Sequence, residues 1–238
     1  MYLRGSMLTR APHSAEILRA MARKADHVER RRLFAAAALN VISRDGLEGL
    51  TLREVAREAG FTTGALTHYF QSKDEVLIAA SEQAAEQVRA PMEEVALGSS
   101  AREALRYLLY TALPTTTVMK ARWRFWVAFW ERAAHSPQVN QVMQERYREW
   151  SGRIASLIRR AQEQGEARAD LDVDLAAREL VALVDGIGVQ VLIAGKLAAP
   201  AQRRFIDSLI DTRLSPSVAR DDHPLSAHAP RRPVRAPA

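Results

Sequence analysis

The sequence contains no cysteine, which excludes disulfide bonds and thiolate metal sites. Long apolar runs are also missing, because charged residues interrupt every hydrophobic stretch well short of a membrane span, and no signal-peptide segment opens the chain. Catalytic signatures are absent too: there is no phosphate-binding glycine loop, no G-x-S-x-G elbow and no H-E-x-x-H pair. We therefore expect a cytoplasmic protein without catalytic residues, cofactor or membrane partner.

A metal site is not expected either. Glu131 and His135 lie four residues apart on one expected helix and could present two ligands, but the sequence identifies no third ligand. A Glu–His pair on a helix is usually a surface or capping contact.

What the chain has in excess is positive charge. Its 34 Lys and Arg residues outnumber its 28 Asp and Glu residues, which gives a formal net charge of +6. This balance favours a polyanionic partner without identifying it. The 238 residues are enough for a small head and a larger body with a substantial core.

Two short helical patterns meet at Gly60. Thr51 and Glu54 are spaced as a capping box, in which the Thr hydroxyl and the Glu carboxylate each accept one free amide, so a helix begins there. Gly60 ends that helix, and Thr62 caps a second one whose inward side holds Leu66. This spacing is typical of a helix-turn-helix, the alternative being an ordinary helical hairpin.

The outward side of the second helix carries small hydrogen-bonding residues and no acid. Thr63 and Thr67 share one strip of it, and Gly64 and His68 share the next. Such a surface can enter a DNA major groove without steric or charge conflict, and a glycine lets the backbone approach phosphate. We expect Thr63, Thr67 and His68 to read bases, with Gly64 and Ala65 allowing close packing.

Other residues are expected to contact the DNA mainly through its backbone. They are Thr51, Arg53, Thr62, Tyr69 and Lys73. Arg53 is long enough to reach a base as well. Lys73 opens the next helix, because Ser72 and Glu75 are spaced as a second capping box.

This segment resembles the DNA-binding domain of TetR-family transcriptional regulators. The resemblance runs through GLEGLTLREVAREAGFTTGALTHYFQSKDEVL, and within it GALTHYFQSKDE matches the recognition helix and the start of the next helix. Its Thr-His-Tyr-Phe run is most similar to the branch that contains the betaine-pathway (choline-responsive) repressors. The resemblance implies a homodimer that binds double-stranded palindromic operator DNA and a small organic effector.

The whole chain is expected to be all-α, with about nine helices. We expect a three-helix head with the helix-turn-helix over residues 26–72 and a larger ligand-binding and dimerisation body over residues 73–214. A disordered basic arm is expected over residues 1–25 and a disordered tail over residues 215–238. The helix that begins at Lys73 belongs to both head and body and can carry a shift from one to the other.

Aromatic residues are concentrated in the body. Nine of the fifteen lie between Tyr107 and Trp150, including every tryptophan. The aromatics of residues 121–135 cover more than one side of a helix, which requires protein around it. The residues expected to line a ligand cavity are Tyr107, Trp123, Trp126, Phe129, Trp130, Glu131, Tyr147 and Trp150. The alternative for each tryptophan is simple core packing.

The expected cavity suits more than one class of ligand. Glu131 is its expected polar or anionic anchor, and an aromatic box with a carboxylate binds quaternary ammonium groups. Aromatic walls also suit flat, apolar molecules. The effector class therefore stays open between aromatic, apolar and cationic molecules.

The family resemblance also implies where two copies of the chain meet. In the TetR family the last two helices pair with their copies across a two-fold axis, which the periodicity here permits. The implied interface residues are Leu180, Leu183, Val184, Ile187, Gly188, Val191, Phe205, Ile206 and Leu209. Gly186 and Gly188 lie inside the first of these helices, where each costs about 1 kcal/mol against alanine, so we expect a close helix approach to offset that cost.

Together these patterns favour a homodimeric transcriptional repressor whose operator binding is relieved by a ligand. Its two heads would lie about 34 Å apart on the DNA, or a multiple of that distance. The alternative is a DNA-targeted dimeric protein-interaction module, or an activator, without a small-molecule inducer.

Overall fold

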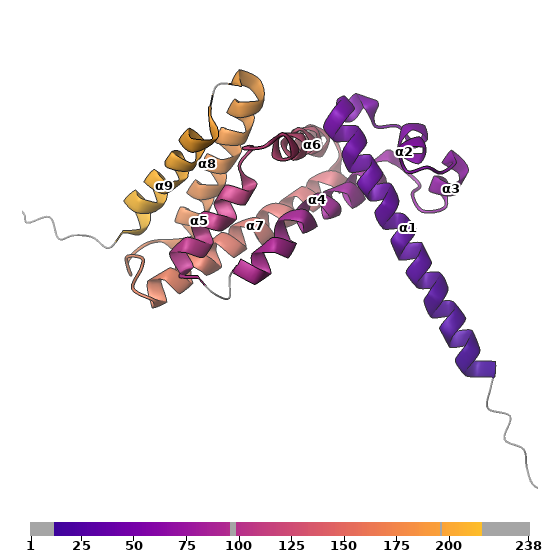
Figure 1. Ribbon diagram of the computed structural model, residues 1–238, viewed down its shortest axis with the longest axis horizontal. Helices are drawn as coiled ribbons and strands as arrows, with labels where there is room; N and C mark the ends of the chain where they lie inside the picture. The colour runs from indigo at the N-terminus through magenta and orange to yellow at the C-terminus, as the bar shows by residue number, and fades with distance from the viewer. Residues whose placement is uncertain (1–11, 96–98, 196, 216–238) are drawn as a thin grey trace, which may run out of the picture.

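The described part of the protein is built from α-helices alone. The computed structural model describes residues 12–95, 99–195 and 197–215 (Figure 1). In chain order its helices are α1 (Pro12–Gly49), α2 (Leu52–Glu58), α3 (Thr63–Thr67), α4 (Lys73–Val95), α5 (Ala101–Ala112), α6 (Thr117–His135), α7 (Pro137–Glu163), α8 (Val173–Ala194) and α9 (Ala199–Leu214). The predicted all-α fold with about nine helices is confirmed. Within the described residues, no helix combines the length and hydrophobicity that crossing a bilayer requires.

Helix α1 begins earlier than expected. The sequence predicted a disordered arm up to residue 25, yet the chain is helical from Pro12, and Figure 1 shows the first turns of α1 projecting away from the other helices. Proline is tolerated in a first helical turn, and no glycine or proline follows before Gly46. Gly46 has a φ of 73° and interrupts the helix. Residues 1–11 and 216–238 lie outside the described residues.

The second half of α1 packs with α2, α3 and the start of α4 into the head. Phe34, Leu66 and Phe70 are fully buried at its centre, and Ala56 is buried beside them. Gly60, in the turn between α2 and α3, has a φ of 77°, a left-handed conformation that glycine adopts without strain. The helix-turn-helix geometry expected at this glycine is present.

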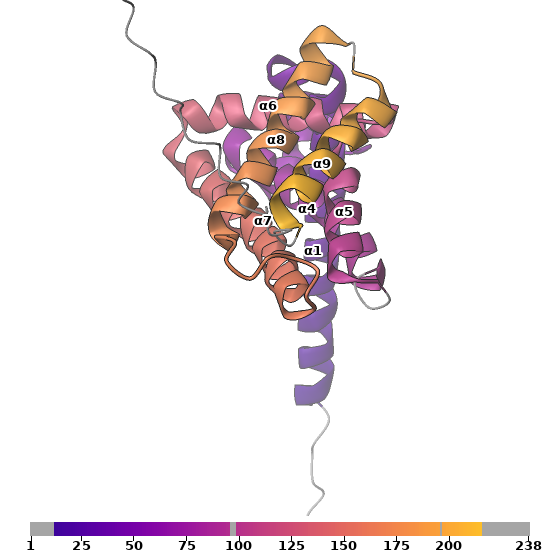
Figure 2. The same cartoon turned by 90° about the vertical axis from the view of Figure 1, so that its left-hand side faces the viewer.

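Helices α5, α7, α8 and α9 enclose the core of the body. Leu105 and Leu108 of α5 are fully buried there, with Ile158 of α7 and Ile206 of α9. Figures 1 and 2 together place α8 and α9 in an outer layer of the body, on the side away from α2 and α3.

Helix α6 lies between the two cores and contributes to both. Phe125 and Phe129 are fully buried in the same cluster as Phe34 of the head. Trp123 belongs instead to the body core, where its ring lies against Gly188 of α8. A Cβ at that glycine would be only 2.2 Å from the nearest ring carbons. A close helix approach at Gly188 is therefore present within the single chain, between α6 and α8.

Candidate DNA-binding surface and ligand cavity

Hydroxyl caps fix the starts of α2, α3 and α4. The Thr51 hydroxyl accepts the backbone N–H of Glu54 at 3.1 Å, and the Thr62 hydroxyl accepts that of Ala65 at 3.2 Å. The capping box expected from Thr51 and Glu54 is only half formed, because the Glu54 carboxylate accepts hydrogen bonds from arginines instead. At α4 the Glu75 carboxylate likewise accepts the N–H of Gln71, at 2.9 Å, one residue earlier than a capping box requires.

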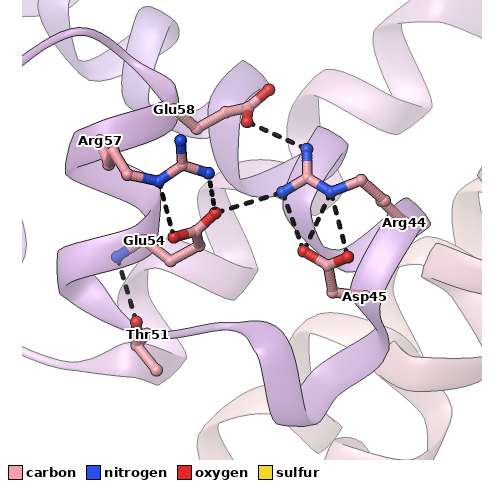
Figure 3. Close-up of polar contacts among 6 residues, drawn as sticks. All are labelled: Arg44, Asp45, Thr51, Glu54, Arg57 and Glu58. Atoms are coloured by element: carbon pink, nitrogen blue, oxygen red, sulfur yellow. Dashed lines mark hydrogen bonds and ion pairs between the residues drawn. The ribbon is translucent and has the colours of Figure 1, made fainter.

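An ion-pair network holds α2 against the end of α1 (Figure 3). Arg44 of α1 donates to Asp45 and reaches Glu54 and Glu58 of α2 at 3.2 and 3.1 Å. Arg57 donates to the Glu54 carboxylate at 2.9 Å. The bond to Asp45, followed by that to Glu58, raises the pKa of Arg44, and the bond from Arg57 lowers the pKa of Glu54. Because solvent screens these groups, the network orients α2 more than it stabilises the fold.

The expected base-reading residues lie together on the outer side of α3. Thr63, Gly64, Thr67 and His68 are exposed, and Ala65 is half-buried. The Thr67 hydroxyl donates to the Gly64 carbonyl at 2.9 Å, which leaves its oxygen lone pairs available as acceptors. No acidic side chain belongs to α3, so this surface can meet the edges of DNA bases.

The expected backbone-binding residues divide into two groups. Thr51, Arg53 and Thr62 are exposed, as the prediction requires. Lys73 is exposed too, but its ammonium donates to the Leu47 carbonyl at 3.2 Å and so caps the end of α1. Tyr69 is half-buried, with its ring centre 4.6 Å from that of His27. The contacts of Lys73 and Tyr69 are thus within the head, whereas Arg53 is a long cation that faces outward.

Arg31 of α1 contacts the segment that directly follows α3. Its Nη1 donates to the Tyr69 carbonyl at 2.7 Å, and its guanidinium carbon lies 4.3 Å from the centre of the Phe70 ring. This contact combines a hydrogen bond with a cation–π interaction. The sequence could not identify it, because three consecutive arginines give no sign of which one turns inward.

The body contains a cavity lined by every tryptophan of the chain. Its volume is about 140 Å³, and α6 and α7 supply most of its walls. The expected ligand residues that line it are Trp123, Trp126, Trp130, Tyr147 and Trp150. Trp123 is held in place by a hydrogen bond from its indole N–H to the Ala112 carbonyl at 2.7 Å.

The other expected ligand residues lie elsewhere. Phe129 is fully buried in the cluster shared with the head, because it follows Phe125 by four residues and so shares its side of α6. Glu131 is exposed, and Tyr107 is half-buried outside the lining. The prediction grouped residues by their place in the sequence without assigning them to sides of a helix.

The polar lining of the cavity was not predicted. It consists of Thr111, Arg122, Arg146, Glu149, Arg153 and Asp185. The Tyr147 hydroxyl donates to Asp185 at 2.9 Å, and burial raises the pKa of Asp185 to about 6. Burial also raises the pKa of Tyr147. Helical spacing could have revealed part of this lining, since Arg122 precedes Trp126 by four residues and so shares its side of α6. In the described part of the chain, no three His, Asp or Glu side chains converge to hold a metal ion.

Asp185→Asn is expected to stabilise the protein above pH 6 and to leave it nearly unchanged at pH 3. The folded state holds the proton of Asp185 more tightly than the unfolded chain, whose carboxyl has the ordinary pKa of 3.8. Stability from this group is therefore fully present below pH 3.8 and is lost as pH rises from there through about 6. The shift corresponds to up to about 3 kcal/mol. Urea unfolding at pH 3 and pH 8 measures it.

The matched control is Glu82→Gln, at an exposed carboxylate of α4. This variant should keep the pH dependence of the free energy of unfolding that the wild-type protein shows. An Asp185→Asn variant with that same pH dependence would show that Asp185 ionises without cost in the folded state.

Most residues expected in the dimer interface are buried within the single chain. Those buried are Leu180, Val184, Ile187, Gly188, Val191 and Ile206. Leu183 and Leu209 are half-buried, while Phe205 is 53% exposed. The outer side of α8 instead carries Ile193, which is 82% exposed, and Gly186, which has no atom within 4 Å of its Cβ position. The helical period marks the apolar side of a helix, and for α8 that side faces the core of its own chain.

Two family profiles match the chain. The profile for bacterial regulatory proteins of the tetR family matches residues 34–80, which contain the helix-turn-helix, and the profile for the C-terminal part of BetI-type transcriptional repressors matches residues 101–215. The HTH-type transcriptional regulator PksA of Bacillus subtilis is 30% identical over 174 residues, which are 73% of this chain and 83% of PksA. The HTH-type transcriptional regulator BetI of Escherichia coli is 29% identical over 192 residues, which are 77% of this chain and 95% of BetI.

Solved structures share the arrangement of head and body. A transcriptional regulator from Saccharomonospora viridis, solved in complex with choline, matches 79% of this chain and 98% of its own with a TM-score of 0.70 and 28% identity. A TetR-family transcriptional regulator from Rhodococcus sp. matches 79% of this chain and 100% of its own with a TM-score of 0.72 and 26% identity.

Proposed function

Because the chain belongs to the TetR family of bacterial transcriptional regulators, which are not enzymes, we propose that it is a homodimeric repressor released from a palindromic operator by a small organic effector. The observation that carries the proposal is the exposed, acid-free side of α3 on a capped helix-turn-helix. In this proposal Thr63, Thr67 and His68 read base edges in the major groove, and Arg53 holds phosphate.

Selection from a random pool of DNA duplexes tests the DNA-binding part of the proposal. The expected product is a two-fold symmetric motif whose half-sites lie about 34 Å apart, or a multiple of that distance, because each head fills one major groove. Recovery of an asymmetric motif, or of no motif, would reject a two-headed operator reader.

The effector binds the cavity lined by tryptophans, and α6 connects that cavity to the head. Trp123, Trp126 and Trp130 of α6 line the cavity, while Phe125 and Phe129 on its other side pack into the head cluster. A ligand that displaces α6 therefore displaces the contact with the head. Relief of DNA binding further requires that the effector bind the two arrangements of the heads with different affinity.

A polar contact adds to this connection. Arg132, near the end of α6, donates to the Asp74 carboxylate at 2.7 and 2.9 Å, and the Ser136 hydroxyl donates to it at 2.8 Å. The bond from Arg132 lowers the pKa of Asp74. Asp74 lies in the first turn of α4, the helix that follows α3, so a movement of α6 reaches the support of the DNA-reading helix directly.

His68→Ala is expected to weaken binding to the selected operator by about 1–3 kcal/mol and to leave binding to random DNA unchanged, because the imidazole contacts a base rather than phosphate. His68 is exposed, so the substitution should not disturb the fold. Fluorescence anisotropy with operator and scrambled duplexes measures both affinities.

Arg53→Ala provides the contrast. Loss of this exposed cation should weaken binding to every duplex and reduce the slope of log affinity against log salt by about one per head. Equal losses on operator and scrambled DNA for both variants would reject the base-reading role of His68. Lys73 is unsuitable for this comparison, because its ammonium also caps α1.

Effector relief is tested by adding compounds to the protein–operator complex. Choline, the ligand bound by the Saccharomonospora viridis protein, belongs in the first set together with flat apolar molecules. Dissociation of the complex by a compound that also raises the unfolding temperature of the free protein supports a ligand-relieved repressor. A protein that no compound stabilises would instead fit a DNA-targeted interaction module.

A further inference from the structure

Three N–H donors of residues that line the cavity have no acceptor among the described residues. They are Nε of Arg122, Nε of Arg146 and Nε1 of Trp130, all of which are buried. A buried donor without an acceptor costs about 1–3 kcal/mol, so proteins usually satisfy such groups. Among the residues that the structure describes, no buried side-chain oxygen of the cavity lining is left without a hydrogen bond in the same way. The groups without partners are therefore donors, and a ligand that carries oxygen atoms would supply their acceptors.

The charges in the lining also favour a ligand that carries acceptor oxygens. The two carboxylates already have partners: Glu149 pairs with Arg146 at 3.1 Å, and Asp185 accepts the Tyr147 hydroxyl at 2.9 Å. Arg122 forms no ion pair with any residue that the structure describes, and desolvation lowers its pKa without a nearby carboxylate to oppose the effect. A guanidinium stays protonated in proteins, so the lining, with Arg122, Arg146 and Arg153 against Glu149 and Asp185, has a formal excess of positive charge.

A cationic ligand would fit the tryptophans but not this charge. Aromatic faces attract quaternary ammonium groups. Such a ligand would, however, add positive charge to a lining that already has an excess of it, and would leave all three donors without acceptors. The tryptophan walls can equally bind an aromatic or apolar body, which needs no charge.

We propose that the effector is a small carboxylate with an aromatic or apolar body, and that Arg122 binds its carboxylate group. A guanidinium presents two parallel N–H donors to a carboxylate, which makes this pairing both strong and selective. The tryptophans hold the body of the ligand, and the indole N–H of Trp130 offers a further donor. This assignment rests on the proposed function, since it specifies the ligand of the same cavity.

Tryptophan fluorescence reports binding directly, because all four tryptophans of the chain line the cavity. The full-length protein is titrated with phenylpropionate, indole acetate and hexanoate, each beside the alcohol and the amine with the same body, and with choline. We expect at least one carboxylate to bind about tenfold or more tightly than its alcohol, and its amine to bind more weakly still.

Arg122→Met tests the residue that is assigned to the carboxylate. This variant should lose about tenfold or more in affinity for the carboxylate and little for the alcohol. Arg122→Lys keeps the charge but not the parallel donors, so it should retain part of the affinity. The control is Arg124→Met, at an exposed residue of α6 that does not line the cavity, and it should bind like the wild type.

Several outcomes would overturn the assignment. They are tightest binding by choline or an amine, an unchanged carboxylate affinity in Arg122→Met, and no binding by any carboxylate of the set. Operator release is measured separately with each compound. If choline or an amine binds and releases the operator, the repressor proposal stands and only the carboxylate assignment fails. If the protein selects no symmetric operator, the proposed function itself fails.

Discussion

Gly188→Ala is expected to lower the free energy of unfolding by about 1–3 kcal/mol. The added Cβ would lie 2.2–2.3 Å from ring carbons of Trp123. The ring cannot easily move aside, because its N–H is bonded to the Ala112 carbonyl and its other neighbour is Trp130, with ring centres 5.8 Å apart. The clash must therefore separate α6 from α8 or distort the cavity. Urea unfolding measures the first effect and tryptophan fluorescence the second.

Gly152→Ala is the matched control for this prediction. Gly152 lies in the interior of α7, is exposed, and has no atom within 4 Å of its Cβ position. Alanine at such a position should raise the free energy of unfolding by about 1 kcal/mol, because it favours the helix without a clash. If both substitutions stabilise the protein, the contact between Gly188 and Trp123 is looser than the structure indicates.

Gly186→Arg is expected to leave the subunit folded but to separate the proposed dimer into monomers. Although it lies only two residues from Gly188, Gly186 has open space at its Cβ position within the single chain. Two apolar side chains in the same outer layer of α8 and α9 are exposed, Ile193 to 82% and Phe205 to 53%. A second copy of the chain packed on this layer would cover them. A long cation between two copies of α8 would prevent their close approach. Because each head of the proposed dimer would hold one half-site, operator affinity should fall about 10²–10⁴-fold.

Sedimentation velocity and operator titration check this prediction together. Gly152→Arg, which places the same side chain on α7, should remain dimeric and bind the operator like the wild type. A Gly186→Arg protein that is folded, dimeric and fully active on the operator would show that copies of this chain do not meet through the middle of α8.

The head was predictable from the sequence because its signals are local. Thr51 and Thr62 cap helices through amides three residues away, and Gly60 turns the chain at its own position. The errors concern the partners of charged side chains. The Glu54 carboxylate accepts from Arg44 and Arg57 instead of completing the expected capping box, and the Lys73 ammonium donates to a carbonyl 26 residues earlier. Which of several possible partners a charged side chain meets depends on how the helices pack.

The body was predictable as a set of helices but not as a site. Periodicity located α6 and α7, and the aromatic-rich region of the sequence contains most of the residues that line the cavity. Aromatic content could not decide which side of α6 faces the cavity and which faces the head, since both sides are aromatic. The same limit applies to α8: an apolar stripe shows that a side is covered, but not whether its own chain or a second copy covers it.

The two-sided packing of α6 bears on how regulators of this type diversify. Under the proposed function, a mutation at Trp126 would change a residue that lines the cavity and also packs against the cluster shared with the head, so a new ligand preference acquired there would come with altered DNA binding. Trp150 of α7 and Val184 of α8 border the same cavity and belong to the body core. Changes in ligand range are therefore expected to accumulate at positions such as these before they occur at Trp126.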